Sequence, residues 1–245
     1  MMKFLRAFIR FILFILLSLG VVIQIMSAAW VANRGLAYRL NIRRKWADRM
    51  TRILGLRIQM EGRIPEGPCL LVGNHRSYID PVIILRDVLA LPVAKSEVRK
   101  WPVVGIGAEV TGTLFVQRSN PQNRRAIRHQ IAQTIKEKGY PIILYVEGTT
   151  HIEPTTIDFK VGMFVMAARE KLAVVPVAID YENLDSAWIG DDTFVPHFFR
   201  TFGKPYTNLR ISYGSPIYHK DFQQMVDLSK DWIDREMLRF RQEWR

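Results

Sequence analysis

The sequence predicts an α/β sandwich with a largely mixed sheet, preceded by a pair of membrane-associated helices. After residue 57, short apolar runs alternate with longer helical patterns, as in a sheet that is covered by helices. Before that point lie one long uncharged run, at residues 11–31, and most of the net positive charge of the chain. We therefore expect a membrane-associated segment at residues 1–57 and a single folded domain at residues 58–245.

The first helix is predicted from 21 consecutive residues without a charged side chain, at 11–31. At ~1.5 Å per residue it reaches about 31 Å, which is enough to cross a bilayer. Lys3, Arg6 and Arg10 precede the run and small residues occupy 27–29, as they would in a signal peptide with its cleavage site. The run is longer than a usual signal core, so we expect the helix to be retained.

The second helix is predicted at 36–54, where apolar and basic residues share the turns. Residues 1–57 carry eleven Lys or Arg against one acid, a net +10 of the chain's +12. A basic amphipathic helix beside an apolar one suits the anionic face of a membrane better than it suits nucleic acid, so membrane lipids are the expected partner. Positive charge flanks the first helix on both sides, which leaves open whether it spans the bilayer or re-enters. The basic residues of the second helix are Arg39, Arg43, Arg44, Lys45, Arg49 and Arg52.

The elements of the domain follow from its apolar runs and their punctuation. Asn120 is expected to cap the helix at 121–138 and Gly139 to end it. Asp80 before Pro81 predicts an N-cap followed by proline at the first helical position. Strands are expected at 57–61, 69–72, 114–116, 142–146, 174–179 and 209–213, and helices at 82–91, 121–138, 161–170 and 221–244.

The residues Asn74 to Pro81 place an imidazole and a carboxylate at a strand-to-helix corner. A turn between His75 and Asp80 brings the two side chains together, with the carboxylate on one ring nitrogen and the other nitrogen facing substrate. An imidazole held in this way is a general base for a hydroxyl. Read alone, Asp80 could equally be a plain helix cap and His75 a plain loop residue.

Polar residues also follow two further predicted strands. Arg118 comes after the strand at 114–116, and Glu147, Gly148 and Thr149 follow the strand at 142–146. Open α/β folds bind ligands at the carboxyl ends of their strands. An exposed arginine and an ordinary turn are the simpler alternatives at these two places.

Other chemistries find little support in the sequence. Cys69 is the single cysteine, which excludes an intrachain disulfide, and its apolar strand suggests a buried small side chain rather than a nucleophile. No Gly-x-Ser-x-Gly elbow of an α/β-hydrolase occurs. His151 and Glu153 lack the spacing of a metal site, so we expect no metal.

Four segments between residues 70 and 180 together resemble the glycerolipid acyltransferase family, the 1-acylglycerol-3-phosphate acyltransferases and their relatives. Asn74-His75 with Asp80 is similar to the family's His-x4-Asp motif. Gly112 to Arg118 resembles the second block, Tyr145 to Thr150 the Pro-Glu-Gly-Thr block, and Val174 to Ile179 the fourth, an apolar strand with a proline. The resemblance implies a glycerolipid-acyltransferase-like fold behind an N-terminal membrane-associated helical pair.

The third block departs from the family pattern at two positions. Val146 stands where proline is usual, and Thr150 stands where many phosphate-using members carry arginine. A threonine cannot replace the bidentate bonds of a guanidinium to phosphate. Relatives that acylate lyso-ornithine lipid resemble this chain in having Glu-Gly-Thr-Thr. Arg118 remains, and Lys95 matches a lysine of phosphate-binding relatives.

The resemblance implies acyl transfer from acyl carrier protein or coenzyme A to the sn-2 hydroxyl of 1-acylglycerol-3-phosphate. His75 would be the base, oriented by Asp80, while Arg118 and Lys95 bind the acceptor's anionic group. Glu147, Gly148 and Thr149 would shape the acceptor site; no cofactor beyond the thioester co-substrate is expected. The enzyme would sit at the inner membrane with its active site facing the cytoplasm. Acylation of another lysolipid such as lyso-ornithine lipid, a non-catalytic lipid-binding protein and a membrane-anchored thioester hydrolase remain as alternatives.

Overall fold

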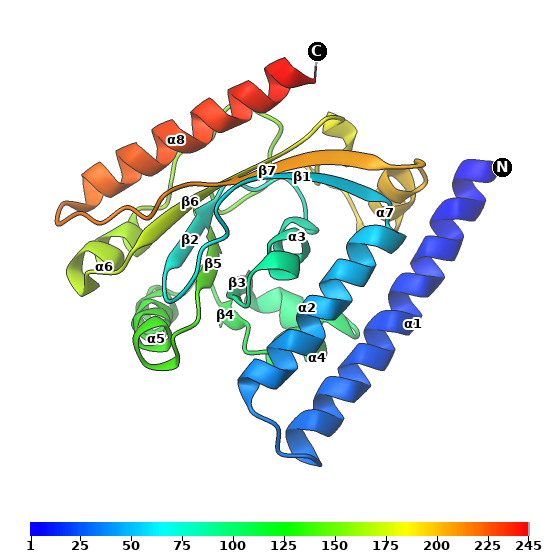
Figure 1. The fold of residues 1–245 in the computed structure, drawn as a ribbon, viewed down its shortest axis with the longest axis horizontal. Helices are drawn as coiled ribbons and strands as arrows, with labels where there is room; N and C mark the ends of the chain where they lie inside the picture. The colour runs from blue at the N-terminus through cyan, green and yellow to red at the C-terminus, as the bar shows by residue number, and fades with distance from the viewer. Residues whose placement is uncertain (245) are drawn as a thin grey trace.

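A computed structural model describes residues 1–244 as a seven-stranded sheet with helices on both faces (Figure 1). The predicted α/β sandwich is confirmed. The strands are β1 Leu56–Gly62, β2 Leu70–Gly73, β3 Leu91–Lys95, β4 Leu114–Val116, β5 Ile142–Tyr145, β6 Val174–Tyr181 and β7 Thr207–Tyr213. The helices are α1 Met2–Trp30, α2 Leu36–Ile53, α3 Asp80–Asp87, α4 Val104–Val110, α5 Pro121–Lys138, α6 Gly162–Glu170, α7 Phe194–Phe202 and α8 Phe222–Glu243, with 3-10 turns at Ser96–Lys100 and Leu184–Ser186.

The sheet is mixed, with strand order β1-β7-β6-β2-β5-β3-β4. Strands β6, β2, β5, β3 and β4 run parallel, whereas β7 is antiparallel to β6 and β1 runs parallel to β7. The parallel strands therefore all end at one side of the sheet, which we call the carboxyl edge. Loops that leave this edge carry the residues singled out in the sequence.

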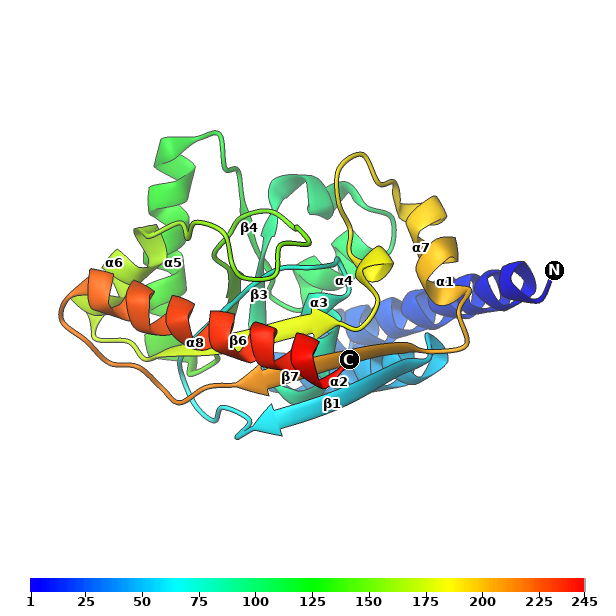
Figure 2. The ribbon, with the colours of Figure 1, turned by 90° about the horizontal axis from the view of Figure 1, so that it is seen from above.

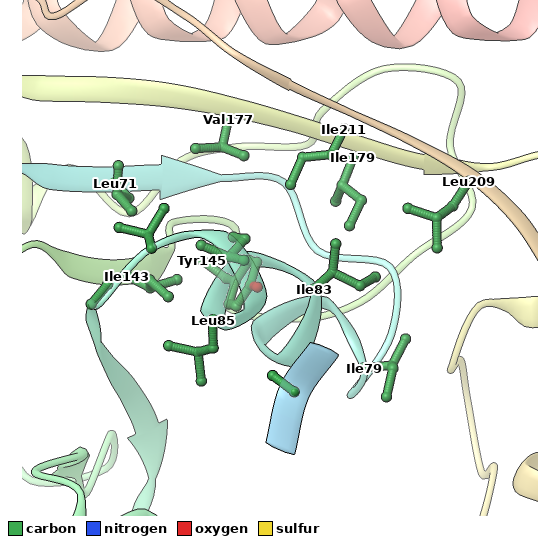
Figure 3. Close-up of a cluster of buried hydrophobic side chains, with 14 of the residues drawn as sticks. Leu71, Ile79, Ile83, Leu85, Ile143, Tyr145, Val177, Ile179, Leu209 and Ile211 are labelled. Carbon is green, nitrogen blue, oxygen red and sulfur yellow. The ribbon is translucent and has the colours of Figure 1, made fainter. Parts of the chain in front are cut away.

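Two apolar layers hold the helices to the sheet. On one face, α1, α2, α3 and α7 pack against side chains such as Leu71 and Ile143, and Figure 3 shows Ile83 and Leu85 of α3 among them. On the other face, α5, α6 and α8 pack against Leu70 and its neighbours. Consecutive residues of β2 thus serve opposite cores, as the two-residue period of a strand requires. Every residue of β2 is buried, so the strand that leads to His75 lies deep in the protein.

The helix predicted over 82–91 is too long, because the structure ends α3 at Asp87 and begins β3 at Leu91. Val88 is already extended. Pro92 prevents the helix from reaching Leu91, because a proline disfavours the helical conformation in the residue before it, and Leu91 instead pairs with Ile142 of β5. The added strand pairs with both β5 and β4, so it joins Arg118's strand to the central sheet.

The expected helix at 121–138 is confirmed, together with both of its ends. Asn120 accepts hydrogen bonds from the amides of Gln122 and Asn123, and Gly139 adopts the left-handed conformation at the other end. The expectation for Asp80 as an N-cap is wrong. Asp80 is the first residue of α3, and its carboxylate accepts from amides that precede it in the chain.

The two N-terminal helices lie against the domain along their length. Arg6 and Arg10 donate to backbone carbonyls at residues 202–205, and Trp46 of α2 donates to Ser18 of α1. Helix α1 is long and apolar enough to cross a membrane by length and composition, and it keeps a stripe of exposed apolar side chains. Met50 of α2 lies in the domain's core. The division at residue 57 stays a prediction.

Candidate active site

His75 and Asp80 meet at the corner between β2 and α3, as the sequence predicted. The ring nitrogen Nδ1 of His75 lies 2.8 Å from Oδ2 of Asp80. Asp80 is wholly buried, whereas 21% of the His75 side chain is exposed. The carboxylate is thus shielded from water while the imidazole reaches the surface.

Asp80 receives hydrogen bonds from four directions. Oδ2 accepts from the amides of Arg76 and Ser77 at 2.7 and 2.8 Å as well as contacting His75, and Oδ1 accepts from the hydroxyl of Tyr181 at 2.6 Å. Since the carboxylate acts as the acceptor, Nδ1 of His75 carries the proton, and the lone pair of Nε2 is left for chemistry. This is the tautomer that a general base needs.

Two buried tyrosines surround the His75–Asp80 pair, which we call the dyad. The Tyr145 ring stacks on the imidazole with centroids 4.0 Å apart, and Tyr181 donates to Asp80 from the end of β6. Burial, followed by the charge of Asp80, raises the pKa of both phenols well above the usual value. Tyr181 is therefore a neutral donor at physiological pH. Sequence reasoning missed both residues because nothing marks a tyrosine in an apolar strand as part of a site.

Glu147 lies behind His75 and is buried, with 2% of its surface exposed. Its Oε2 accepts from the backbone amide of His75 at 2.7 Å, and its Oε1 accepts from Nε2 of His151 at 2.7 Å and from the amide of Ile157 at 3.1 Å. Its role as part of the acceptor site stays a prediction. What the contacts show is that this carboxylate links the third-block loop to the backbone of His75.

A second buried charge cluster supports the same corner. The Arg76 guanidinium is buried, donates to the carbonyls of His151 and Glu153 at 2.7 and 2.6 Å, and comes within 3.3 Å of Asp180. Arg241 of α8 donates to the other oxygen of Asp180 at 2.7 Å. Burial lowers the pKa of Arg76, and the charges of Asp180 and Glu147 oppose that shift. The loop after β5 is thereby fastened to the sheet and to α8.

The cationic side of the site is built around Gly148. Arg118 donates to the Gly148 carbonyl, and the side chain of Lys160 lies against the same residue. Gly148 has a φ of +75°, which an L side chain adopts only under strain, so glycine is required there. Thr149 is exposed beside it. Lys160 is therefore a second cation beside Gly148.

Lys95 lies at the end of β3, where it pairs with Val116 of β4, two residues before Arg118. Its side chain is exposed. The carboxyl edge therefore carries His75, Lys95, Arg118 and Glu147 on four neighbouring strands, in the order β2, β5, β3, β4. Within residues 1–244, no cluster of three or more His, Cys, Asp or Glu side chains has the arrangement of a metal site.

Comparison with known proteins agrees with the geometry. A family model described as Acyltransferase matches residues 56–180. The lyso-ornithine lipid O-acyltransferase of Brucella abortus is 32% identical over 190 residues, covering 69% of this chain and 70% of the relative. A 1-acyl-sn-glycerol-3-phosphate acyltransferase of Haemophilus influenzae is 29% identical over 185 residues, covering 72% and 74%.

A solved structure shares the fold. The crystal structure of the 1-acyl-sn-glycerophosphate acyltransferase PlsC from Thermotoga maritima superposes with a TM-score of 0.64 at 20% identity, over 94% of this chain and 97% of that one. The matched segment, residues 56–180, contains all four sequence blocks and the His75–Asp80 corner. The chain therefore belongs to the glycerolipid acyltransferase family.

Proposed function

We propose that the protein is a membrane-associated acyltransferase that moves a fatty acyl group from an acyl thioester to a hydroxyl of a lysolipid. The observation that carries the proposal is the imidazole of His75, held at Nδ1 by Asp80 with Nε2 free, beside the two cations at Gly148. A general base next to an anion-binding group suits a hydroxyl acceptor with a charged head group.

In this mechanism, Nε2 of His75 takes the proton of the acceptor hydroxyl as the oxygen attacks the thioester carbonyl carbon. The new C–O bond forms, the C–S bond breaks, and the imidazolium returns the proton to the leaving thiolate. Asp80 stabilises the imidazolium while it exists. Acyl-coenzyme A and acyl carrier protein can each supply the thioester, and no other cofactor enters the proposal.

The first candidate acceptor is an amino-acid lysolipid such as lyso-ornithine lipid. Thr150 replaces the arginine of many phosphate-using relatives, and three relatives, including one from Brucella abortus, are named lyso-ornithine lipid O-acyltransferases. Lysophosphatidate, which the sequence alone ranked first, becomes the second candidate. Arg118 and Lys160 favour an anionic head group in either case, since each can contact a carboxylate or a phosphate.

For location, we propose that α1 and α2 rest on the anionic leaflet of the inner membrane with the active site facing the cytoplasm. The exposed apolar stripe of α1 supports insertion, and the exposed Arg44, Lys45, Arg49 and Arg52 of α2 support contact with anionic lipid. Arg39 and Arg43 of the same helix instead bind carbonyls of the domain at Val110 and Ala90.

The test is acyl transfer by the purified full chain in detergent, with labelled acyl thioester and a panel containing lyso-ornithine lipid and lysophosphatidate. We expect His75→Ala to lower kcat by about 10²- to 10⁴-fold, the range for loss of a general base. His219→Ala removes an exposed imidazole whose hydrogen bonds, within residues 1–244, go to the backbone of Asp221, and it should leave the rate unchanged.

The outcomes separate the alternatives. Transfer that persists in His75→Ala would contradict the mechanism. Wild-type protein that transfers to no acceptor but binds the lysolipids would support the non-catalytic reading, and thioester loss without a lysolipid would indicate a hydrolase. The acceptor used faster by the wild type decides between the two head groups.

A further inference from the structure

Beyond the N-terminal segment, positive charge gathers on α5. This helix carries five Lys or Arg against one acid, whereas the whole chain after residue 57 has a net charge of only +2. Most of these cations are exposed. The rest of the domain is thus slightly acidic, and α5 is its distinct basic surface.

A groove of about 560 Å³ separates α5 from α6. Its volume is that of an ordinary binding site. Two acids also line it, of which Glu170 is held by Lys136 at 2.7 Å. The basic residues that line it are Arg125, Arg128, His129 and Lys136 of α5 and Arg169 of α6.

The groove begins at the catalytic end of the sheet. Helix α5 starts just after β4 leaves the carboxyl edge and returns to the opposite edge, because it connects two parallel strands. Arg124 donates to the Arg118 carbonyl, and the Arg128 side chain lies beside Gly162 at the start of α6. Arg118 in turn donates to Gly148, next to Glu147 and His75. A continuous set of contacts therefore joins the groove's mouth to the dyad.

The same groove lies far from the apolar helix α1. Helices α5 and α6 pack on the face of the sheet opposite α1 and α7, whereas α2 contributes Met50 to one core and Leu40 to the other. Figures 1 and 2 place α5 and α6 at one end of the molecule and α1 at the other. A membrane that holds α1 leaves the groove open to the aqueous phase, where a soluble partner can reach it.

We infer that the α5–α6 groove is the docking surface for an acidic carrier protein that delivers the acyl thioester. The inference rests on the proposed acyl transfer. The α5 cations from Arg124 to Lys138 spread over roughly 21 Å at about 1.5 Å per residue. The phosphates of coenzyme A would need cations gathered at one point, whereas an acidic protein surface matches a row. The thioester arm enters beside Arg118 and Gly148.

The test compares two donors with the same acyl chain, one on acyl carrier protein and one on coenzyme A. Arg125→Glu combined with Arg169→Glu reverses two exposed cations of the groove. We expect KM for the carrier-linked donor to rise about tenfold or more, with kcat and the KM for the coenzyme A donor changed less than about twofold. Arg235→Glu reverses an exposed cation of α8 outside the groove and should change neither KM.

A direct binding measurement separates the docking inference from the proposed acyl transfer. Labelled carrier protein should bind the wild type with an affinity that falls as salt rises and should bind the double variant weakly. Failure of the carrier to bind the wild type, or equal loss with both donors, would overturn the inference. Loss of binding to anionic vesicles in the double variant would overturn it in favour of a membrane contact. If neither donor supports transfer while the carrier still binds, the proposed acyl transfer is wrong and the docking inference stands.

Discussion

At the scale of single residues, the hydrogen bond from the Tyr181 hydroxyl to Asp80 is the contact of the dyad that no sequence motif predicts. Three of the four contacts of the carboxylate come from residues 75–77, which a short turn brings together. The fourth comes from Tyr181 at the end of β6. Tyr181 therefore acts on His75 through Asp80, as a positioning residue.

We expect Tyr181→Phe to lower kcat by about tenfold with little change in KM, because the carboxylate loses a bond that fixes its orientation. A hydrogen bond to a charged group contributes about 1.5–3 kcal/mol, which makes a tenfold effect reasonable. Steady-state kinetics of the purified variant measures both constants.

Tyr213→Phe is the matched control for this change. Tyr213 is buried in the same cluster, but its hydroxyl has no hydrogen-bond partner within the described residues. Its kcat and KM should equal those of the wild type, and thermal unfolding should confirm that both variants fold. Equal losses in the two variants would assign the effect to packing and not to the bond with Asp80.

Cys69 gives a prediction about pH and reactivity. The thiol lies in the apolar core with 3% of the residue exposed, and burial raises its pKa to about 12. At pH 8 it is a protonated, shielded thiol, so mass spectrometry should find it unmodified after iodoacetamide treatment of the native protein and fully modified in denaturant. Rapid native alkylation with loss of activity would contradict this and would place the thiol within reach of the site.

At the scale of elements, Arg6 and Arg10 attach the N-terminal end of α1 to the domain by different numbers of hydrogen bonds. Arg10 donates to the carbonyls of Phe202, Lys204 and Pro205, whereas Arg6 donates to that of Gly203 alone. Replacing either arginine by alanine removes one positive charge, so the two variants differ only in the number of hydrogen bonds lost. We expect Arg10→Ala to lower amide-exchange protection of residues 2–30 by about tenfold or more and Arg6→Ala to lower it less.

Hydrogen exchange of the full chain in detergent measures this difference, with β2 as the internal reference, since its protection should not change. Equal effects of the two variants would mean that charge, and not the number of hydrogen bonds, attaches the helix. A drop in β2 protection would show that α1 supports the whole sheet.

The elements also show where sequence reasoning worked and where it stopped. Helix α5 was predictable to the residue because Asn120 and Gly139 are strong local signals. Strand β3 was missed because its apolar residues continue those of α3, although Pro92 was a usable breaker signal. The His75–Asp80 contact was predictable because the two residues stand only five positions apart. Tyr181 and Lys160 were not, because only the tertiary fold brings them to the site.

At the scale of the whole molecule, the sheet separates two surfaces of similar charge. The exposed basic residues of α2 and the cations of α5 both raise the net charge, and composition alone cannot distinguish them. Their positions on opposite faces of the sheet suggest two routes to one dyad, with the lipid acceptor arriving from the α1 side and the donor from the α5 side. The strand order that creates these faces was beyond prediction from local patterns.

The contact between Arg241 and Asp180 also has a consequence for how the protein is made. Asp180 pairs with Arg76, which binds the loop behind His75. Arg241 completes this cluster, yet it is synthesised long after Arg76 and Asp180. The apolar α1 leaves the ribosome before the domain does, and Arg241 leaves it after β6 and Asp180. The nascent chain can therefore settle at its membrane while its catalytic corner is still incomplete, and activity should begin only once α8 has folded onto the sheet.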